Sequence, residues 1–76
     1  MRGIVFDYSD LIGLIIAKYG SRKRFAQAAG MAPSSLSMKL RGNTAWSTDE
    51  IAKAKELLGF PSESIVKYFF TSKVPQ

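Results

Sequence analysis

The sequence predicts a small all-α domain, and three observations support this fold class. Apolar residues recur three and four positions apart in five stretches, which is the spacing that gives a helix one apolar face. Most of these stretches are followed by glycine, the residue preferred just beyond a helix end. The chain has 76 residues without internal repeats or linkers, so we expect one domain over residues 1–76.

The first helix is expected over residues 8–19. Asp7 should cap it, since its carboxylate can accept a hydrogen bond from a free first-turn N–H group. One stripe of this helix should face the core: Tyr8, Leu11, Ile12, Ile15 and Tyr19. Ile16 lies at the edge of the stripe and Leu14 well off its centre. We expect these two either to be ordinary surface residues or to contact another protein.

Two shorter helices are expected next, over residues 22–29 and 33–41, with a tight turn between them. Ser21 is a preferred N-cap residue for the first of them. Gly30 follows that helix where a left-handed backbone is wanted, a conformation in which a Cβ atom would clash. Pro33 fits the first turn of the second helix because it has no N–H group to satisfy there.

Residues 21–42 resemble the helix-turn-helix of the Cro/CI-type repressors of phages and their bacterial relatives. A small residue lies four positions before Gly30 and an apolar one six after it, so the two helices can cross closely. The matching residues are Phe25, Ala26, Ala29, Gly30, Met31, Leu36 and Gly42. Lys39 departs from the pattern, because the family usually carries an apolar residue there. The resemblance implies a five-helix lambda-repressor-like DNA-binding domain whose second and third helices form the motif.

A capping box opens the fourth helix, which should run to Leu58. Ser47 and Glu50 have the spacing at which each side chain accepts from the backbone N–H group of the other. Trp46 before the cap and Ile51 after it fit a hydrophobic staple. We therefore expect Trp46 to be a structural residue.

A very apolar fifth helix is expected over residues 63–70, followed by a short tail. In Cro-like proteins the C-terminal segment often forms the dimer. The resemblance therefore implies a homodimer, with contacts from Tyr68, Phe70 and Val74. A second possibility is a short terminal β segment, in which residues 4–6 pair with residues 72–74.

The charge distribution suggests a polyanion as partner. The formal net charge is +5, and no acidic residue occurs between Asp10 and Asp49. The basic residues of this window are Lys18, Arg22, Lys23, Arg24, Lys39 and Arg41. The alternative is a solvated basic surface that keeps the protein soluble. The overlap of this window with the helix-turn-helix favours double-stranded DNA.

The motif implies two groups of DNA contacts. Side chains on the outward side of the helix over residues 33–41 should enter the major groove and read base edges: Pro33, Ser34, Ser37, Met38 and Arg41. DNA phosphates should be contacted by Arg22, Lys23, Arg24, Lys39, Asn43 and Thr44. For Met38 the alternative is incidental surface exposure.

An enzyme is not expected. The chain has no Cys and no His, which removes disulfides, thiolate zinc sites and the commonest general base. Helix capping explains the carboxylates of Asp49 and Glu50, and we expect no cofactor and no metal. No stretch is long and apolar enough for a transmembrane helix or a signal peptide, so we expect the bacterial cytoplasm or nucleoid and no membrane contact.

Two functions follow as expectations. The main one is a sequence-specific DNA-binding transcription regulator of the phage or prophage Cro or repressor type, which acts by operator occupancy as a homodimer. The alternative is an antirepressor or modulator that binds another phage repressor protein. An apolar patch of Pro33 and Met38, together with Leu14, would favour the alternative.

Overall fold

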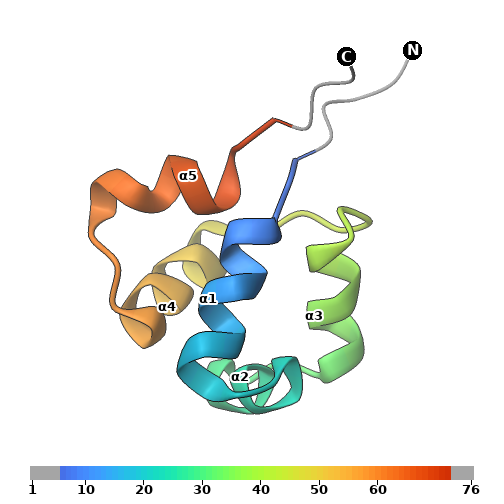
Figure 1. Cartoon of the computed structure of the whole chain (residues 1–76). Coiled ribbons are helices and arrows are strands. Elements are labelled where there is room, and N and C mark those ends of the chain that lie inside the picture. Colours follow the sequence, from blue (N-terminus) through green and yellow to red (C-terminus); the bar gives the residue numbers. More distant parts are fainter. Residues whose placement is uncertain (1–5, 73–76) are drawn as a thin grey trace.

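Helix α1 (Ser9–Tyr19) lies at the centre of the molecule, and the other helices pack around it (Figure 1). The computed structural model describes residues 6–72. The remaining elements are α2 (Arg22–Ala29), α3 (Pro33–Leu40), α4 (Thr48–Leu58), a 3₁₀ turn η1 (Ser62–Ser64) and α5 (Ile65–Phe69). α1 contacts α2, α4 and α5, while α3 packs on α2. The prediction of an all-α fold with five helices is confirmed.

Every helix contributes to one hydrophobic core. The largest fully buried side chains are Leu11, Ile15, Phe25, Leu36, Leu58 and Phe69. Leu14 is half-buried and packs against this core, whereas we expected a surface residue. The reason is that α1 has neighbours on several sides, so a residue far from its main apolar stripe still meets another element. Ile16 is 40% exposed, in line with the prediction.

α1 begins one residue later than predicted, so its N-cap is Tyr8 and not the expected Asp7, and Tyr8 makes no side-chain capping hydrogen bond. The Asp7 carboxylate accepts hydrogen bonds from the Ser9 backbone N–H at 2.9 Å and from the Ser9 hydroxyl at 2.6 Å. Tyr8 lies between them with φ −100° and ψ 16°, outside the helical region. Its carbonyl nevertheless accepts from Ile12, so the first turn is closed.

The turn between α2 and α3 has the predicted chemistry. The Ser21 hydroxyl accepts from the Arg24 backbone N–H at 3.1 Å. Gly30 has φ 74°, and Met31 donates to the Ala26 carbonyl at 2.9 Å, which closes a Schellman ending. A Cβ atom on Gly30 would meet nothing within 4 Å. The requirement for glycine therefore comes from the backbone conformation itself and not from a neighbouring side chain.

α3 ends one residue earlier than predicted, because Arg41 is its C-cap. Gly42 follows with φ 83°, and Asn43 donates to the Met38 carbonyl at 2.9 Å. This second Schellman ending turns the chain away from the helix axis at Gly42.

The last predicted helix, over residues 63–70, is split. Residues Ser62–Ser64 form the 3₁₀ turn and α5 ends at Phe69. Pro61, in extended conformation, precedes this segment, and its carbonyl accepts from Ser64 three residues on, which is 3₁₀ geometry.

The two ends of the described chain meet in an antiparallel bridge between Phe6 and Ser72. The Asp7 N–H donates to the Thr71 carbonyl at 2.7 Å. This contact confirms part of the predicted terminal β pairing, while its other positions, residues 4–5 and 73–74, lie outside the described residues. No helix within residues 6–72 is long and apolar enough to cross a membrane.

Candidate functional site

The outward side of α3 has the residues that the helix-turn-helix resemblance assigned to partner contact. Leu36 and Leu40 are buried and fix the inward direction of this helix. Four of the predicted base-reading residues are exposed and Ser37 is half-buried; the exposed ones are Pro33, Ser34, Met38 and Arg41. The structure therefore brings these side chains to one surface.

Met38 stands at the C-terminal end of this surface and is 38% exposed. Its sulfur is approached by Arg41 Nη2 at 4.0 Å and by Asn43 Nδ2 at 3.9 Å. The Schellman ending after Arg41 brings Asn43 back over the last turn of α3. A thioether, a guanidinium and an amide thus form one exposed group.

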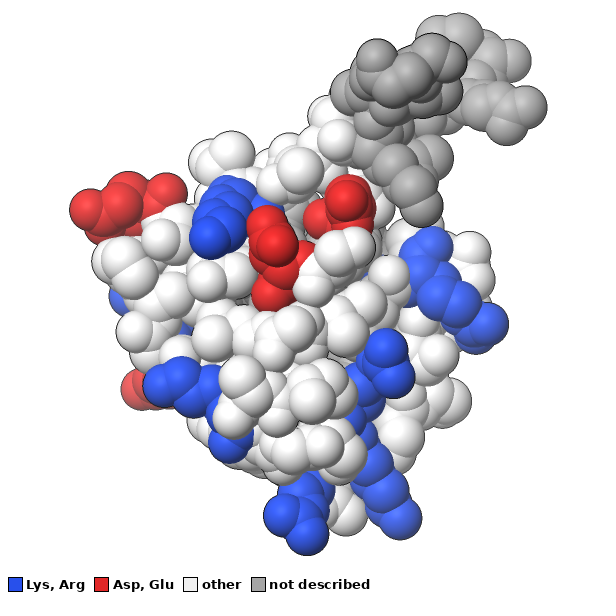
Figure 2. All heavy atoms as spheres, in the orientation of Figure 1, with Lys and Arg blue, Asp and Glu red and all other residues white. Residues whose placement is uncertain are grey.

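Basic side chains surround this surface. Arg22, Lys23 and Arg24 are all exposed in the first turn of α2. Figure 2 shows Lys and Arg gathered over the part of the molecule where Figure 1 places α2 and α3, while most of the visible carboxylates lie in the upper half. Arg22 and Arg41 also line one hollow of about 220 Å³ together with Ser37. This face is therefore positively charged and suits an acidic partner.

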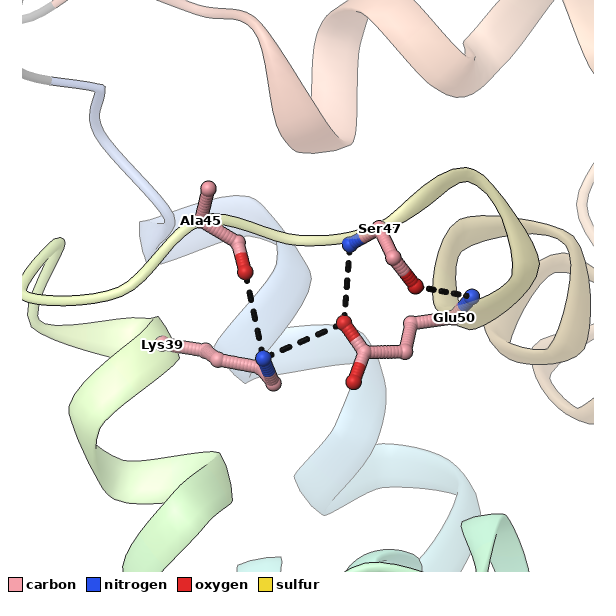
Figure 3. A network of polar contacts seen from close by, with 4 residues as sticks. All are labelled: Lys39, Ala45, Ser47 and Glu50. Carbon is pink, nitrogen blue, oxygen red and sulfur yellow. Dashed lines mark hydrogen bonds and ion pairs between the residues drawn. The ribbon is translucent and has the colours of Figure 1, made fainter.

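Lys39, predicted to contact phosphate, is instead half-buried and bonded to Glu50 and Ala45 (Figure 3). Its Nζ atom lies 3.1 Å from Glu50 Oε1 and donates to the Ala45 carbonyl at 3.1 Å. The Lys39 side chain is only 13% exposed. It occupies the position where the repressor family usually has an apolar residue, so its stem is covered and its charge is neutralised by α4. We exclude Lys39 from the candidate surface for this reason.

The same network contains the predicted capping box. Glu50 accepts from the Ser47 N–H at 2.8 Å, and the Ser47 hydroxyl accepts from the Glu50 N–H at 3.1 Å (Figure 3). The hydrogen bond from the Ser47 backbone, followed by Lys39, lowers the pKa of Glu50 below its ordinary value of 4.5 against the opposing effect of burial. Lys39 and Glu50 therefore tie the last turn of α3 to the start of α4.

The residues predicted for dimer or partner contact do not behave alike. Phe70 is 46% exposed, and its ring lies edge-to-face on Phe6 at 5.6 Å. Tyr68 is half-buried and packs on Phe60 at 4.7 Å, so it supports the core. Val74 lies outside the described residues. Val66, expected within an apolar helix, is 65% exposed.

An aromatic cavity of about 410 Å³ was not predicted from the sequence. We use the name aromatic cavity for the space lined by Phe6, Tyr8, Trp46, Ile51, Phe69 and Phe70, with residues 41–45 at its rim. Trp46 lies edge-to-face on Phe69 at 5.0 Å, in line with its expected structural role. The predicted pairing of residues 4–6 with 72–74 was the signal that could have brought Phe6 and Phe70 together.

The exposed side chains of the α2–α3 face are of types that bind the surface of another molecule. Nowhere in residues 6–72 do three His, Cys, Asp or Glu side chains come together in a way that could hold a metal ion. The exposed groups on the α2–α3 face are cations, hydroxyls and a thioether. Such groups recognise a surface through charge and shape.

Comparisons with known proteins were made for the whole chain. The family described as "Protein of unknown function (DUF739)" matches residues 4–72. The solution structure of the modulator of repression (MOR) of the temperate bacteriophage TP901-1 from Lactococcus lactis is 41% identical in sequence, with a TM-score of 0.78. The match covers 92% of this chain and 95% of that one. No curated protein matches the chain.

Proposed function

The chain belongs to the DUF739 family, and from this premise we propose that it is a modulator of repression that binds a phage repressor protein. The observation that carries this proposal is the likeness to MOR, which extends over nearly the whole of both chains. This function is the alternative that the sequence left open. Operator occupancy, the main expectation from the sequence, becomes the second candidate.

The chemistry of α3 supports a protein partner. Bidentate base recognition in the major groove relies mainly on Arg and Lys for guanine and on Asn and Gln for adenine. The exposed side of α3 begins instead with Pro33 and Ser34 and continues to Met38. Met is a side chain that adapts its shape to protein surfaces. The cations of α2 at the edge of this surface would then pair with carboxylates of the repressor.

DNA binding remains a second candidate because of one specific observation. Arg22, Lys23 and Arg24 occupy the first turn of α2, where cations oppose the helix dipole. Phosphates would compensate for that cost, and free N–H groups at a helix start also bind phosphate. Asn43 and Thr44 are exposed in the loop after α3 and have the polar side chains that such contacts use.

The test is to compare complex formation with operator binding. The protein is mixed with a phage repressor, and the mixture is studied by analytical ultracentrifugation and by gel shift on the operator of that repressor. We expect a stable complex with the repressor and a loss of the repressor's operator shift. A run with the protein alone measures whether it is the homodimer expected from the family resemblance.

The operator duplex also distinguishes the two candidate functions, binding of a repressor and occupancy of an operator. If the protein alone binds DNA through about six phosphates, log K should fall against log salt with a slope of roughly −5. Such binding, together with no repressor complex, would overturn the proposal in favour of operator occupancy. A random duplex serves as the control for sequence-independent binding.

A further inference from the structure

The aromatic cavity is connected to the α2–α3 face. Three hollows adjoin one another near the C-terminal end of α3, and all three are lined by its C-cap residue Arg41. The hollow nearest α2 also has Arg22 and Ser37 in its wall. The middle hollow shares Phe6 and Tyr8 with the aromatic cavity. A partner that covers Ser37 and Arg41 would therefore also lie next to the aromatic cavity.

The cavity combines aromatic walls with a polar rim that includes the cation of Arg41. Five of its lining residues are aromatic: Phe6, Tyr8, Trp46, Phe69 and Phe70. At the rim, Arg41 has no carboxylate partner among residues 6–72, and its Nη2 makes only a long contact with the Met38 sulfur at 4.0 Å. Asp7, the acid that lines the adjoining hollow, accepts from Ser9. The occupant that complements this site is apolar and carries a negative charge at its outer end.

We propose that the aromatic cavity receives a bulky apolar side chain of the partner repressor, and that a carboxylate next to this side chain in the repressor pairs with Arg41. This inference rests on the proposed function. It adds an anchor residue to the proposed interface, because interfaces derive most of their affinity from a few residues, chiefly Trp, Tyr and Arg, that occupy well-packed pockets.

The size of the cavity agrees with such an occupant. Its volume of about 410 Å³ lies within the range of protein cavities that enclose a ligand. A single aromatic or large aliphatic side chain fits inside this volume with space left over, and it would lie against Phe70, which is 46% exposed.

A small probe tests the cavity without any repressor. The chain has a single tryptophan, and Trp46 lines the cavity, so its fluorescence reports on occupancy. Titration with 3-phenylpropionate should change this fluorescence, and the neutral 3-phenylpropanamide should bind about threefold to tenfold more weakly. Arg41→Gln should remove this preference, whereas Lys53→Gln on α4 makes the same charge change away from the cavity and should keep it. Equal binding of both probes to the wild type would overturn the role of Arg41.

A second pair of variants tests the partner. Ala45 lies at the cavity rim, and Ala45→Leu should block the mouth while its backbone carbonyl still accepts from Lys39. We expect this variant to bind the repressor at least about tenfold more weakly. The matched control is Ala52→Leu, an exposed alanine of α4 outside the cavity. Melting followed by circular dichroism confirms that each variant is folded, and Arg41→Gln replaces Ala45→Leu in this assay if the latter unfolds.

The outcomes separate the two proposals. If the wild-type protein does not bind the repressor, the proposed function is wrong, whatever the probes do. If the wild type binds the repressor and the cavity variants bind it equally well, the function stands and the anchor is wrong. A probe signal that is lost in Ala45→Leu, together with weaker repressor binding by that variant, supports both.

Discussion

Removal of the Glu50 side chain should destabilise the protein through two partners at once. Glu50→Ala deletes the acceptor of the Ser47 N–H at 2.8 Å and the carboxylate 3.1 Å from Lys39 Nζ. The Lys39 side chain is only 13% exposed, so its ammonium would keep the Ala45 carbonyl as its protein partner but lose the opposite charge. Both the start of α4 and its link to α3 are affected.

The expected loss of stability in Glu50→Ala follows from these contacts. Loss of a helix-capping interaction costs about 0.5–2 kcal/mol. An ion pair whose carboxylate side chain is 31% exposed contributes at most about 1 kcal/mol after solvent screening. We therefore expect Glu50→Ala to lower the free energy of unfolding by about 1–2 kcal/mol, and the melting temperature by about 5–15 °C in a domain of this size. Glu50→Gln keeps an oxygen for the Ser47 N–H and should cost less.

The pH dependence of stability gives a second measure of the contribution of Glu50. Because the pKa of Glu50 is lowered by folding, chiefly through the Ser47 backbone hydrogen bond, its contribution to stability is present above its ordinary pKa of 4.5. That contribution is lost as the pH falls through the lower pKa of the folded state. The difference in melting temperature between the wild type and Glu50→Gln should therefore be largest near neutral pH and should shrink in acid.

Thermal melting followed by circular dichroism at pH 7 and pH 3 measures both effects. Glu56→Gln is the matched control, because Glu56 is an exposed glutamate on the same helix. A Glu50→Ala variant that melts at the wild-type temperature, or a Glu50→Gln difference that grows in acid, would refute the reasoning.

Three further changes have definite expected results. Trp46→Ala should lower the free energy of unfolding by about 3 kcal/mol, since the ring packs on Phe69 and Tyr8. Thermal melting checks this: a normal melting temperature with lost partner binding would show that Trp46 contacts the partner instead. Gly30→Ala should cost about 1–2 kcal/mol in urea unfolding although its Cβ would touch nothing, because φ is 74°. Met38→Asp should leave the melting temperature within about 2 °C of wild type but weaken the repressor complex, by isothermal titration calorimetry, because the side chain is exposed on the α3 surface. Undiminished affinity in that variant would exclude the end of α3 from the interface.

The helices could be predicted because their signals are local. Ser47 and Glu50 lie three residues apart and cap each other, and Gly30 follows a complete apolar stripe. The ends of α1 and α3 were each wrong by one residue, since a boundary depends on the hydrogen bonds of single groups around Tyr8 and Arg41. The 3₁₀ turn after Pro61 was missed because a 3₁₀ turn and the first turn of an α-helix have similar sequences.

The candidate site was harder to predict because it depends on distant residues. Lys39 and Glu50 belong to different helices, and the only local sign of their contact was a lysine at a position that is usually apolar. The aromatic cavity needs Phe6, Trp46 and Phe69 together, which only the path of the chain determines. The sequence also did not decide between DNA and protein as the partner. Ser34 and Met38 on the exposed side of a helix-turn-helix can contact either a groove of DNA or a protein surface.

The bridge between Phe6 and Ser72 has a consequence for the order of folding. α1, α2 and α3 contact their neighbours in sequence, so their packing needs only short loop closures. The bridge is one isolated residue pair at the two ends of the described chain, where local opening is easiest. It should therefore form late and break early, and its loss would release Phe6 from Phe70 while α2 and α3 stay packed. One wall of the aromatic cavity thus depends on a contact at the ends of the described chain, so mild warming should open the cavity before the helices melt.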